Sequence, residues 1–125
     1  MVAHTRRRAG ETGLANVRVA QRDVFTAGFD LPAASCDACL LFNILHGEAP
    51  VDMLCEARRV VQLGGTVAVI HWQCDLPTPR GPSADIRPSA EQILKWAETA
   101  GGLAAAEPPF SLPPWHYGVK LLKTQ

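Results

Sequence analysis

The sequence predicts an α/β protein in which a mostly parallel sheet ends in an antiparallel strand pair and carries helices on both faces. Two apolar runs, Asp37–Asn43 and Thr66–Ile70, have the composition of buried strands. Between them, apolar side chains from Val51 to Val61 recur at spacings of three and four residues, which is typical of one helix face. Because strand, helix and strand follow one another, we expect a crossover unit whose two strands pair in parallel.

The chain before these strands predicts a helix and a further strand. Val2–Thr12 is rich in alanine and arginine and is followed by Gly13, which suits the C-terminal cap of a helix. In Asn16–Gln21 two valines alternate with polar residues, which is the pattern of a half-buried strand. This strand would lead into Asp23, so we expect a carboxylate at its carboxyl end.

The central helix is expected to begin near Pro50, because proline is favoured in the first helical turn. It is expected to stop at Gly64 and Gly65, which would form a tight turn into the strand at Thr66–Ile70. Residues 75–88 hold four of the ten prolines of the chain, and this favours an ordered loop over a site.

The last third of the chain predicts one more helix and two short strands. Ser89 is followed three residues later by a glutamine, which is the spacing of a capping box. The helix is expected to end at the glycine pair that begins at Gly101. Leu103–Glu107 and Val119–Lys123 are expected to pair as an antiparallel hairpin at the edge of the sheet.

Composition limits the classes of function. The chain of 125 residues fits one domain, residues 1–125, and 47% hydrophobic with 19% charged residues indicates a globular protein. Twelve basic and twelve acidic residues give a formal net charge of zero, so we expect no nucleic-acid or membrane partner and favour a small-molecule ligand. The apolar runs are shorter than the roughly 20 residues of a membrane span. No apolar segment follows the N-terminal arginines as in a secretory signal, so we expect a cytoplasmic protein.

Four stretches of the sequence, taken in their order and spacing, match one family: Asn16–Asp23, Cys36–His46, Glu56–Val67 and His116–Val119. In these stretches the chain resembles the class I S-adenosylmethionine-dependent methyltransferases of the small-molecule type. The resemblance implies a partial Rossmann-like sheet, S-adenosylmethionine as cofactor, and in-line transfer of a methyl group to a small-molecule acceptor. Leu63 stands where the family usually has a proline before the glycine pair.

The chain departs from the family at its N-terminus. The family begins with a strand and a glycine-rich loop that holds the methionine end of the cofactor, and at roughly 30 residues per strand-helix unit about 50 to 60 residues are expected to be missing. The sequence therefore predicts a single methyltransferase-like domain that is N-terminally truncated relative to the family. Strands without their neighbours would have open edges, which invite a homodimer.

Two other functions are weighed against methyl transfer. One is a non-catalytic remnant of a methyltransferase that acts through self-association or through a partner chain. The other is a nicotinamide-binding domain of similar topology, which is disfavoured because no G-x-G-x-x-G motif occurs in the chain.

Five residues are expected to contact the cofactor. The resemblance implies that Asp23 accepts a hydrogen bond from the adenine amino group and that the main chain of Val24 contacts a ring nitrogen; a carboxylate suits the first role because it only accepts. Phe42, Asn43 and Ile44 lie where a parallel strand releases its chain, and ligands bind at that edge of an open sheet. The competing roles are helix capping for Asp23, turn capping for Asn43 and packing for Phe42.

Two histidines are candidates for a general base. His46 and His71 each follow a strand end, so in this fold both would project over the same edge of the sheet. The competing interpretation is a loop histidine whose hydrogen bonds are satisfied within the protein. Their spacings match no standard metal motif, so no metal is expected.

Four further residues are candidates for binding the methyl acceptor. Trp72 and Tyr117 would form rigid apolar walls near the proline-rich segments, and His116 precedes the start of the last strand. Arg87 borders the proline-rich loop and would hold an anionic group of the acceptor. Ordinary packing for the aromatic residues and a solvated surface position for the arginine are the competing interpretations. Oxygen, nitrogen, carbon and sulfur nucleophiles are all compatible with these loops as the methyl acceptor.

Overall fold

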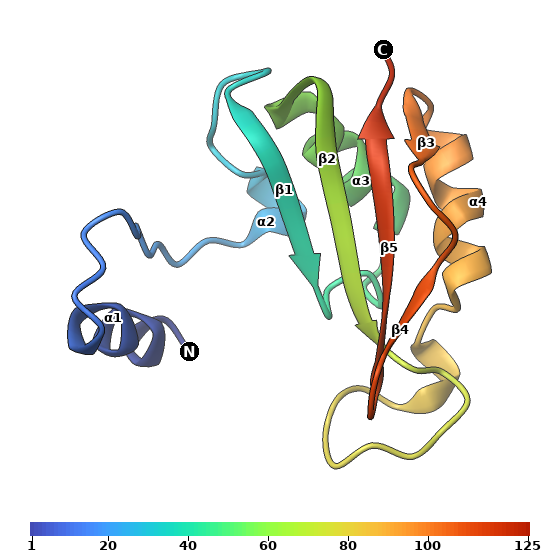
Figure 1. Ribbon diagram of the computed structural model, residues 1–125, viewed down its shortest axis with the longest axis horizontal. Helices are drawn as coiled ribbons and strands as arrows, with labels where there is room; N and C mark the ends of the chain where they lie inside the picture. The colour runs from blue at the N-terminus through green and yellow to red at the C-terminus, as the bar shows by residue number, and fades with distance from the viewer.

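The computed structural model describes residues 1–125, and its centre is a five-stranded mixed sheet with helices packed behind it (Figure 1). The strands are ordered β1-β2-β5-β3, and β4 also pairs with β5. The elements in chain order are α1 (Val2–Glu11), α2 (Val24–Ala27), β1 (Cys36–Phe42), α3 (Pro50–Val60), β2 (Val61–Trp72), a 3₁₀ turn (Ala84–Ile86), α4 (Ala90–Ala100), β3 (Leu103–Ala105), β4 (Phe110–Leu112) and β5 (His116–Lys123).

The directions of the strands confirm the α/β class and refine the predicted sheet. β1 and β2 pair in parallel, and α3 forms the crossover between them, as predicted. β5 pairs antiparallel with β2, β3 and β4, so the expected antiparallel partners at the C-terminus are present. The term mostly parallel was imprecise, because β1 with β2 is the one parallel pair in a mixed sheet.

The core lies between the sheet and the helices α3 and α4. Buried side chains of β2 and β5 alternate along each strand and meet the apolar stripes of the two helices in one cluster. The fully buried members with the largest side chains are Leu45, Leu54, Ile93, Leu121, Val60, Val61, Val67, Val69 and Val119. The helical side of the sheet therefore holds the apolar core of the protein.

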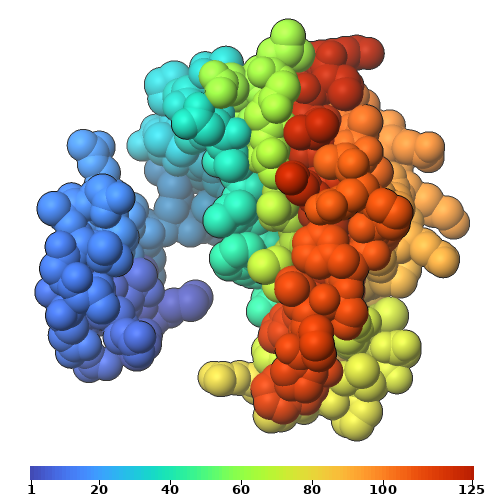
Figure 2. Space-filling model, in the orientation of Figure 1, coloured from blue at the N-terminus to red at the C-terminus, as the bar shows by residue number.

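The prediction of helices on both faces is wrong. Figure 2 shows β1, β2 and β5 side by side on the opposite face with no helix over them. On this face Leu40 is 58% exposed and Phe42 is 54% exposed. The helix at the N-terminus does not cover them, because α1 buries no residue and lies apart from the sheet (Figure 1).

The predicted strand Asn16–Gln21 is also wrong. The segment runs from α1 to α2 without strand structure, and Val17 is 41% exposed. A strand is stabilised by pairing and by side chains on its neighbours, and β1 pairs only with β2. The alternating pattern is present in the sequence, but the chain places no strand beside it.

The junction between α3 and β2 differs from the predicted one. The helix ends at Val60 and β2 begins at Val61, so Gly64 and Gly65 lie inside the strand instead of ending the helix. The register between β1 and β2 is irregular in this region, which indicates a bulge. Gly64 has a φ of 78°, and the strand bends there at no steric cost.

Replacing Gly65 with alanine is expected to destabilise the fold by about 1–3 kcal/mol. A Cβ atom at this position would lie 2.7 Å from the main-chain oxygen of Asp37 and 2.8 Å from that of Gln62, and backbone atoms yield less easily than side chains. Urea unfolding of Gly65→Ala would measure the loss. Gly10→Ala is the control, because nothing lies near a Cβ atom there, and its stability should not fall. Equal stability of Gly65→Ala and the native chain would contradict the crowding.

The predicted end of the proline-rich loop and the start of the last helix are confirmed. The Ser89 hydroxyl accepts a hydrogen bond from the Gln92 main-chain nitrogen at 3.1 Å, and α4 continues to Ala100 before Gly101.

Pro50 is the first residue of α3, as expected. No helix in the structure combines the length and the apolar character that crossing a membrane requires.

Candidate functional site

The topology of the sheet brings four polar side chains together at one edge. The parallel pairing of β1 and β2 sets Phe42, the last residue of β1, opposite Ile70, so the chain after β1 lies beside the last residues of β2. The antiparallel pairing of β2 with β5 sets Trp72 opposite His116. At this edge lie Asn43, His46, His71 and His116, which we call the histidine cluster. Open α/β sheets bind their ligands at this edge, beyond the carboxyl ends of the parallel strands.

His46 and His71 contact each other, but His71 lies within β2, which continues to Trp72, and not after the strand end as predicted. The Nδ1 atom of His46 lies 3.4 Å from the Nε2 atom of His71, and the two rings meet edge to face with centroids 5.5 Å apart. His71 is fully buried, and burial is the largest cause that lowers its pKa from 6.5 to about 4, with the charges of His46, Arg87 and His116 adding to the effect. His71 is therefore a neutral imidazole near pH 7.

The hydrogen bonds of the pair define where each proton lies. The Nδ1 atom of His71 is 3.3 Å from the carbonyl oxygen of Trp72, and a carbonyl can only accept, so the proton of neutral His71 is on Nδ1. Its Nε2 atom must then accept, which requires that His46 donate from Nδ1. Neutral His46 consequently keeps an unprotonated Nε2 atom, which is the state a general base needs.

Asn43 forms the second contact of the cluster. Its main-chain nitrogen donates to the Ile70 oxygen at 2.8 Å, and its side-chain Nδ2 donates to Nε2 of His116 at 3.4 Å. The backbone of Asn43 has a φ of 54°, which asparagine tolerates better than most residues. Its Oδ1 atom is buried and has no hydrogen-bond partner. An unpartnered buried acceptor of this kind fits a ligand that supplies a hydroxyl or amino donor.

Two aromatic side chains, Trp72 and Tyr117, border the cluster. The Trp72 ring stacks on the ring of His116 with centroids 4.1 Å apart, and the Tyr117 ring lies 6.4 Å from that of His71. The Tyr117 hydroxyl donates to the Pro88 oxygen at 2.6 Å, and burial raises its pKa well above the ordinary value. Tyr117 therefore stays protonated and ties the last strand to the end of the proline-rich loop.

Arg87 holds the proline-rich loop instead of pointing a free guanidinium into the cluster. Its nitrogens donate to the Pro82 oxygen at 2.8 Å, to the Gln73 oxygen at 3.1 Å and to Thr78 Oγ1 at 2.7 Å. The guanidinium also lies 5.8 Å from the centre of the Trp72 ring. These contacts occupy most of its donors, so a structural role is the one the geometry favours.

The other predicted cofactor residues lie outside the cluster. Asp23 is the N-cap of α2, where its Oδ1 atom accepts from the Phe25 nitrogen at 3.2 Å. Phe25 in turn packs against Gly47, in the turn that follows β1. Val24 and Ile44 pack against the core, and the Phe42 side chain is exposed on the uncovered face of the sheet.

A small hollow separates α2 from the start of α3. It has a volume of about 160 Å³ and is lined by Val24, Phe25 and Glu56 among others, so it is smaller than the usual pocket for a drug-sized ligand. Glu56 joins the two helices, because its carboxylate accepts from the Phe29 nitrogen at 3.0 Å and from Arg59 at 2.7 Å. The hydrogen bond from Arg59 is the main cause that lowers the Glu56 pKa from 4.5 to about 2.

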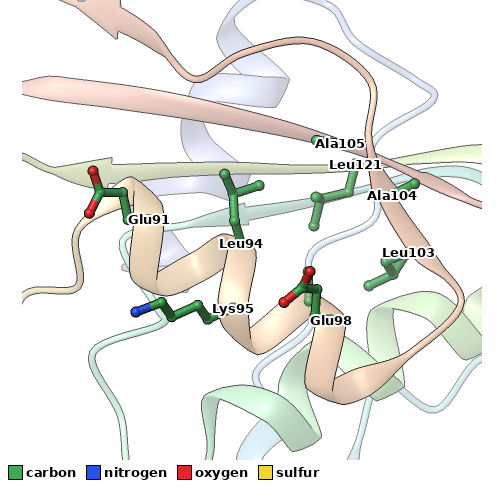
Figure 3. A pocket seen from close by; sticks show the side chains of 9 residues that line it. Glu91, Leu94, Lys95, Glu98, Leu103, Ala104, Ala105 and Leu121 are labelled. Atoms are coloured by element: carbon green, nitrogen blue, oxygen red, sulfur yellow. The ribbon is translucent and has the colours of Figure 1, made fainter.

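A larger groove of about 540 Å³ lies along α4 beside β3 and β5, away from the histidine cluster. Figure 3 shows Leu94, Leu103 and Leu121 between the helix and the strands, with Glu91 and Lys95 at its helical border. It contains none of the predicted site residues, and no cluster of three or more metal-ligating side chains occurs in the structure.

One residue of this region was missed by the sequence analysis. Gln73 directly follows β2, and its side chain donates to the His116 oxygen at 3.2 Å while its main-chain nitrogen donates to the Trp115 oxygen at 2.7 Å. It fixes the start of β5 against the end of β2. The available signal was a polar amide placed immediately after an apolar strand, the same signal that identified Asn43.

Comparison with solved structures shows that the chain has the fold of the class I S-adenosylmethionine-dependent methyltransferases. A SAM-dependent methyltransferase from Aquifex aeolicus is 22% identical, with a TM-score of 0.81 over 98% of this chain and 63% of its own. A putative type 11 methyltransferase from Sulfolobus solfataricus is 21% identical, with a TM-score of 0.66 over 94% of this chain and 65% of its own. The [4+2]-cyclase SpnF is 16% identical, with a TM-score of 0.79 over 98% of this chain and 62% of its own.

These likenesses concern the fold, since the identities are low. The chain spans between 62% and 65% of the length of these three structures. No protein-family model and no curated protein matches the sequence. The predicted resemblance is thereby confirmed at the level of the fold.

Proposed function

We propose that the chain serves S-adenosylmethionine-dependent methyl transfer to a small-molecule acceptor. The histidine cluster carries the proposal, because it places an unprotonated His46 Nε2 atom at the edge of the sheet where this fold class binds ligands. The cyclase among the solved structures shows that one fold serves more than one reaction, so the proposal rests on the residues of the cluster as well as on the fold.

The residues present fit the cofactor at two points. The buried Oδ1 atom of Asn43 lacks a donor, and the hydroxyl and amino groups of S-adenosylmethionine are donors. Asp23 uses one carboxylate oxygen for the helix cap, which leaves the other for the adenine amino group. Val24, Phe42 and Ile44 would supply main-chain and apolar contacts. When bound, S-adenosylmethionine supplies the methyl group together with its own leaving group.

In this proposal His46 removes a proton from the acceptor, and His71 is a positioning residue. The acceptor donates its proton to Nε2 of His46 as its nucleophilic atom takes up the methyl group. The positive charge that His46 gains lies beside a neutral His71, whose Nε2 accepts the hydrogen bond from Nδ1. Trp72 and His116 form the stacked wall against which the acceptor would be oriented, and positioning of this kind supplies much of the rate in a displacement reaction.

Titration calorimetry with S-adenosylhomocysteine tests the binding step. We expect the native chain to bind and Asp23→Ser to bind about tenfold more weakly, because one hydrogen bond to a carboxylate is lost. Serine caps a helix as well as aspartate does, so α2 should remain folded in this variant. Asp30→Asn is the control, since the Asp30 side chain is 80% exposed and lies outside the cluster.

Two outcomes would overturn parts of this proposal. Absence of binding to the native chain would reject cofactor binding by residues 1–125. Equal affinity of Asp23→Ser and the native chain would leave Asp23 as a helix cap only.

A further inference from the structure

The uncovered face of the sheet presents an apolar strip along β1. Ala38, Leu40 and Phe42 point to this face, opposite to the half-buried Cys39 and the buried Leu41. Leu40 and Phe42 are among the most exposed large apolar residues of the folded body, at 58% and 54%. Contiguous exposed apolar surface is common where a protein segment, a membrane or a ligand binds.

The main-chain groups of the same three residues form the unpaired edge of the sheet, along β1. The Asn43 nitrogen donates toward β2, to the Ile70 oxygen, and the direction of the main-chain groups alternates along a strand. The N–H and C=O groups of Ala38, Leu40 and Phe42 are therefore directed away from β2. No other strand pairs with β1, so this edge is open to an added strand.

The N-terminal arm, residues 1–21, contains a strand-like segment that pairs with no strand of its own chain. Its helix α1 buries no residue, and its segment Asn16–Gln21 has the alternating pattern of a strand without a partner. The arm extends away from the folded body in Figures 1 and 2. It is anchored at its end by Arg22, whose side chain donates to the Gly28 oxygen at 2.7 Å and to the Ala27 oxygen at 2.8 Å.

The charges of the arm and of the body are complementary. The arm holds four arginines and one glutamate, a formal charge of +3. Because the whole chain has a formal charge of zero, residues 22–125 carry −3. Opposite net charges favour the association of an arm with a body and accelerate their encounter.

We propose that two copies of the chain associate by exchanging these arms. The segment Asn16–Gln21 of each copy adds as a strand to the β1 edge of the other, and Val17 and Val19 extend the apolar strip formed by Leu40 and Phe42. The segment has six residues and β1 has seven, so their lengths match. In Figure 1 the arm stands out from the body on the side of β1 and does not pack against that strand. The arm of a second copy is the occupant because the complementary charges of arm and body favour association between copies. Mutual exchange closes the assembly as a twofold dimer.

Light scattering coupled to size-exclusion chromatography, over a range of concentrations, tests the exchange on the full chain. We expect a mass of twice 13.5 kDa for the native chain. Leu40→Lys alters the β1 edge and Val17→Lys alters the arm, and each is expected to weaken dimerisation by at least about tenfold. Both side chains are exposed in the single chain, so the variants should keep the circular dichroism spectrum of the native protein.

Ile86→Lys is the matched control. Ile86 is 50% exposed but lies in the 3₁₀ turn of the proline-rich loop, so this variant should dimerise like the native chain. Hydrogen exchange adds a second measurement, because the amides of Leu40 and Phe42 should be protected in the native dimer and exchange quickly in Val17→Lys.

Several results would overturn the proposal. One is a native chain that remains monomeric at every concentration, and another is a dimer that survives both lysine substitutions. Protection of the Leu40 and Phe42 amides in a monomer would show that the arm folds onto its own sheet. None of these results depends on binding of S-adenosylhomocysteine, so the dimer and the proposed enzymatic function can fail separately.

Discussion

Lowering the pH from 7 to 4 is expected to reduce the free energy of unfolding by about 3 kcal/mol through His71 alone. In the folded protein burial lowers the pKa of this imidazole from 6.5 to about 4. Below pH 6.5 the unfolded chain therefore binds a proton that the folded chain does not bind. The stability is complete above pH 6.5, falls as the pH drops to 4, and loses nothing further from this group below 4. Each pH unit in that window corresponds to about 1.36 kcal/mol.

Urea unfolding at a series of pH values measures this effect. His71→Asn keeps an amide that can donate and accept but removes the titration, so its stability should be nearly independent of pH between 6.5 and 4. His4→Asn is the control, because His4 is an exposed residue of α1, and it should keep the native pH dependence. A native chain whose stability is flat in this window, or a control that also becomes flat, would show that His71 is not the group responsible.

Glu56 contributes to acid unfolding in a lower window. Its pKa is lowered to about 2 from 4.5, so its carboxylate stabilises the folded state above pH 4.5 and that stabilisation is lost as the pH falls toward 2. Protonation of either group lowers the free energy of unfolding, but the loss through His71 falls mainly between pH 6.5 and 4, and the loss through Glu56 mainly between pH 4.5 and 2. The two effects are therefore separable on one pH series.

The elements predicted correctly are those whose signals lie close together in the sequence. The apolar run of β1, the stripe of α3 and the Ser89 cap of α4 depend on residues within one or two turns of each other. The parallel pairing of β1 with β2 followed from the crossover helix between them.

The incorrect predictions depend on contacts that are distant in the sequence. Asn16–Gln21 has a strand pattern, but a strand also needs a neighbour, and no local signal reports whether one is present. Helices on both faces of the sheet were predicted because the β1 segment is apolar at nearly every position. Leu40, one of these apolar residues, lies exposed on the face without helices. A continuous apolar run does not distinguish a doubly covered strand from an open one.

For the candidate site, strand ends could be predicted but hydrogen bonds could not. The meeting of His46 and His71 follows from the parallel pairing of β1 and β2, whose carboxyl ends point to the same end of the sheet. The protons of His46 and His71 can be assigned only from the contact of His71 with the Trp72 carbonyl, which the sequence does not reveal. The hydrogen bonds of Arg87 likewise depend on the conformation of the proline-rich loop. Asn43 was identified by its type and place, whereas its unpartnered oxygen is visible only in the packed structure.

Replacing Leu54 with alanine is expected to cost about 2–5 kcal/mol of the free energy of unfolding. Leu54 lies on α3, is fully buried, and belongs to the one core of 15 buried residues on the helical side of the sheet. Because the other face of the sheet is uncovered, no second apolar layer exists to offset the cavity. A loss of this size is a large share of the 5–15 kcal/mol by which domains are usually stable.

Leu63→Ala is the matched control, because it removes the same atoms from an exposed leucine of β2. Leu63 is 69% exposed, so the same truncation there should change the stability by less than about 0.5 kcal/mol. Urea unfolding of both variants at pH 7, where His71 is neutral and Glu56 is ionised, isolates the packing effect from the titrations. If both truncations cost the same, Leu54 would not lie in the stabilising core.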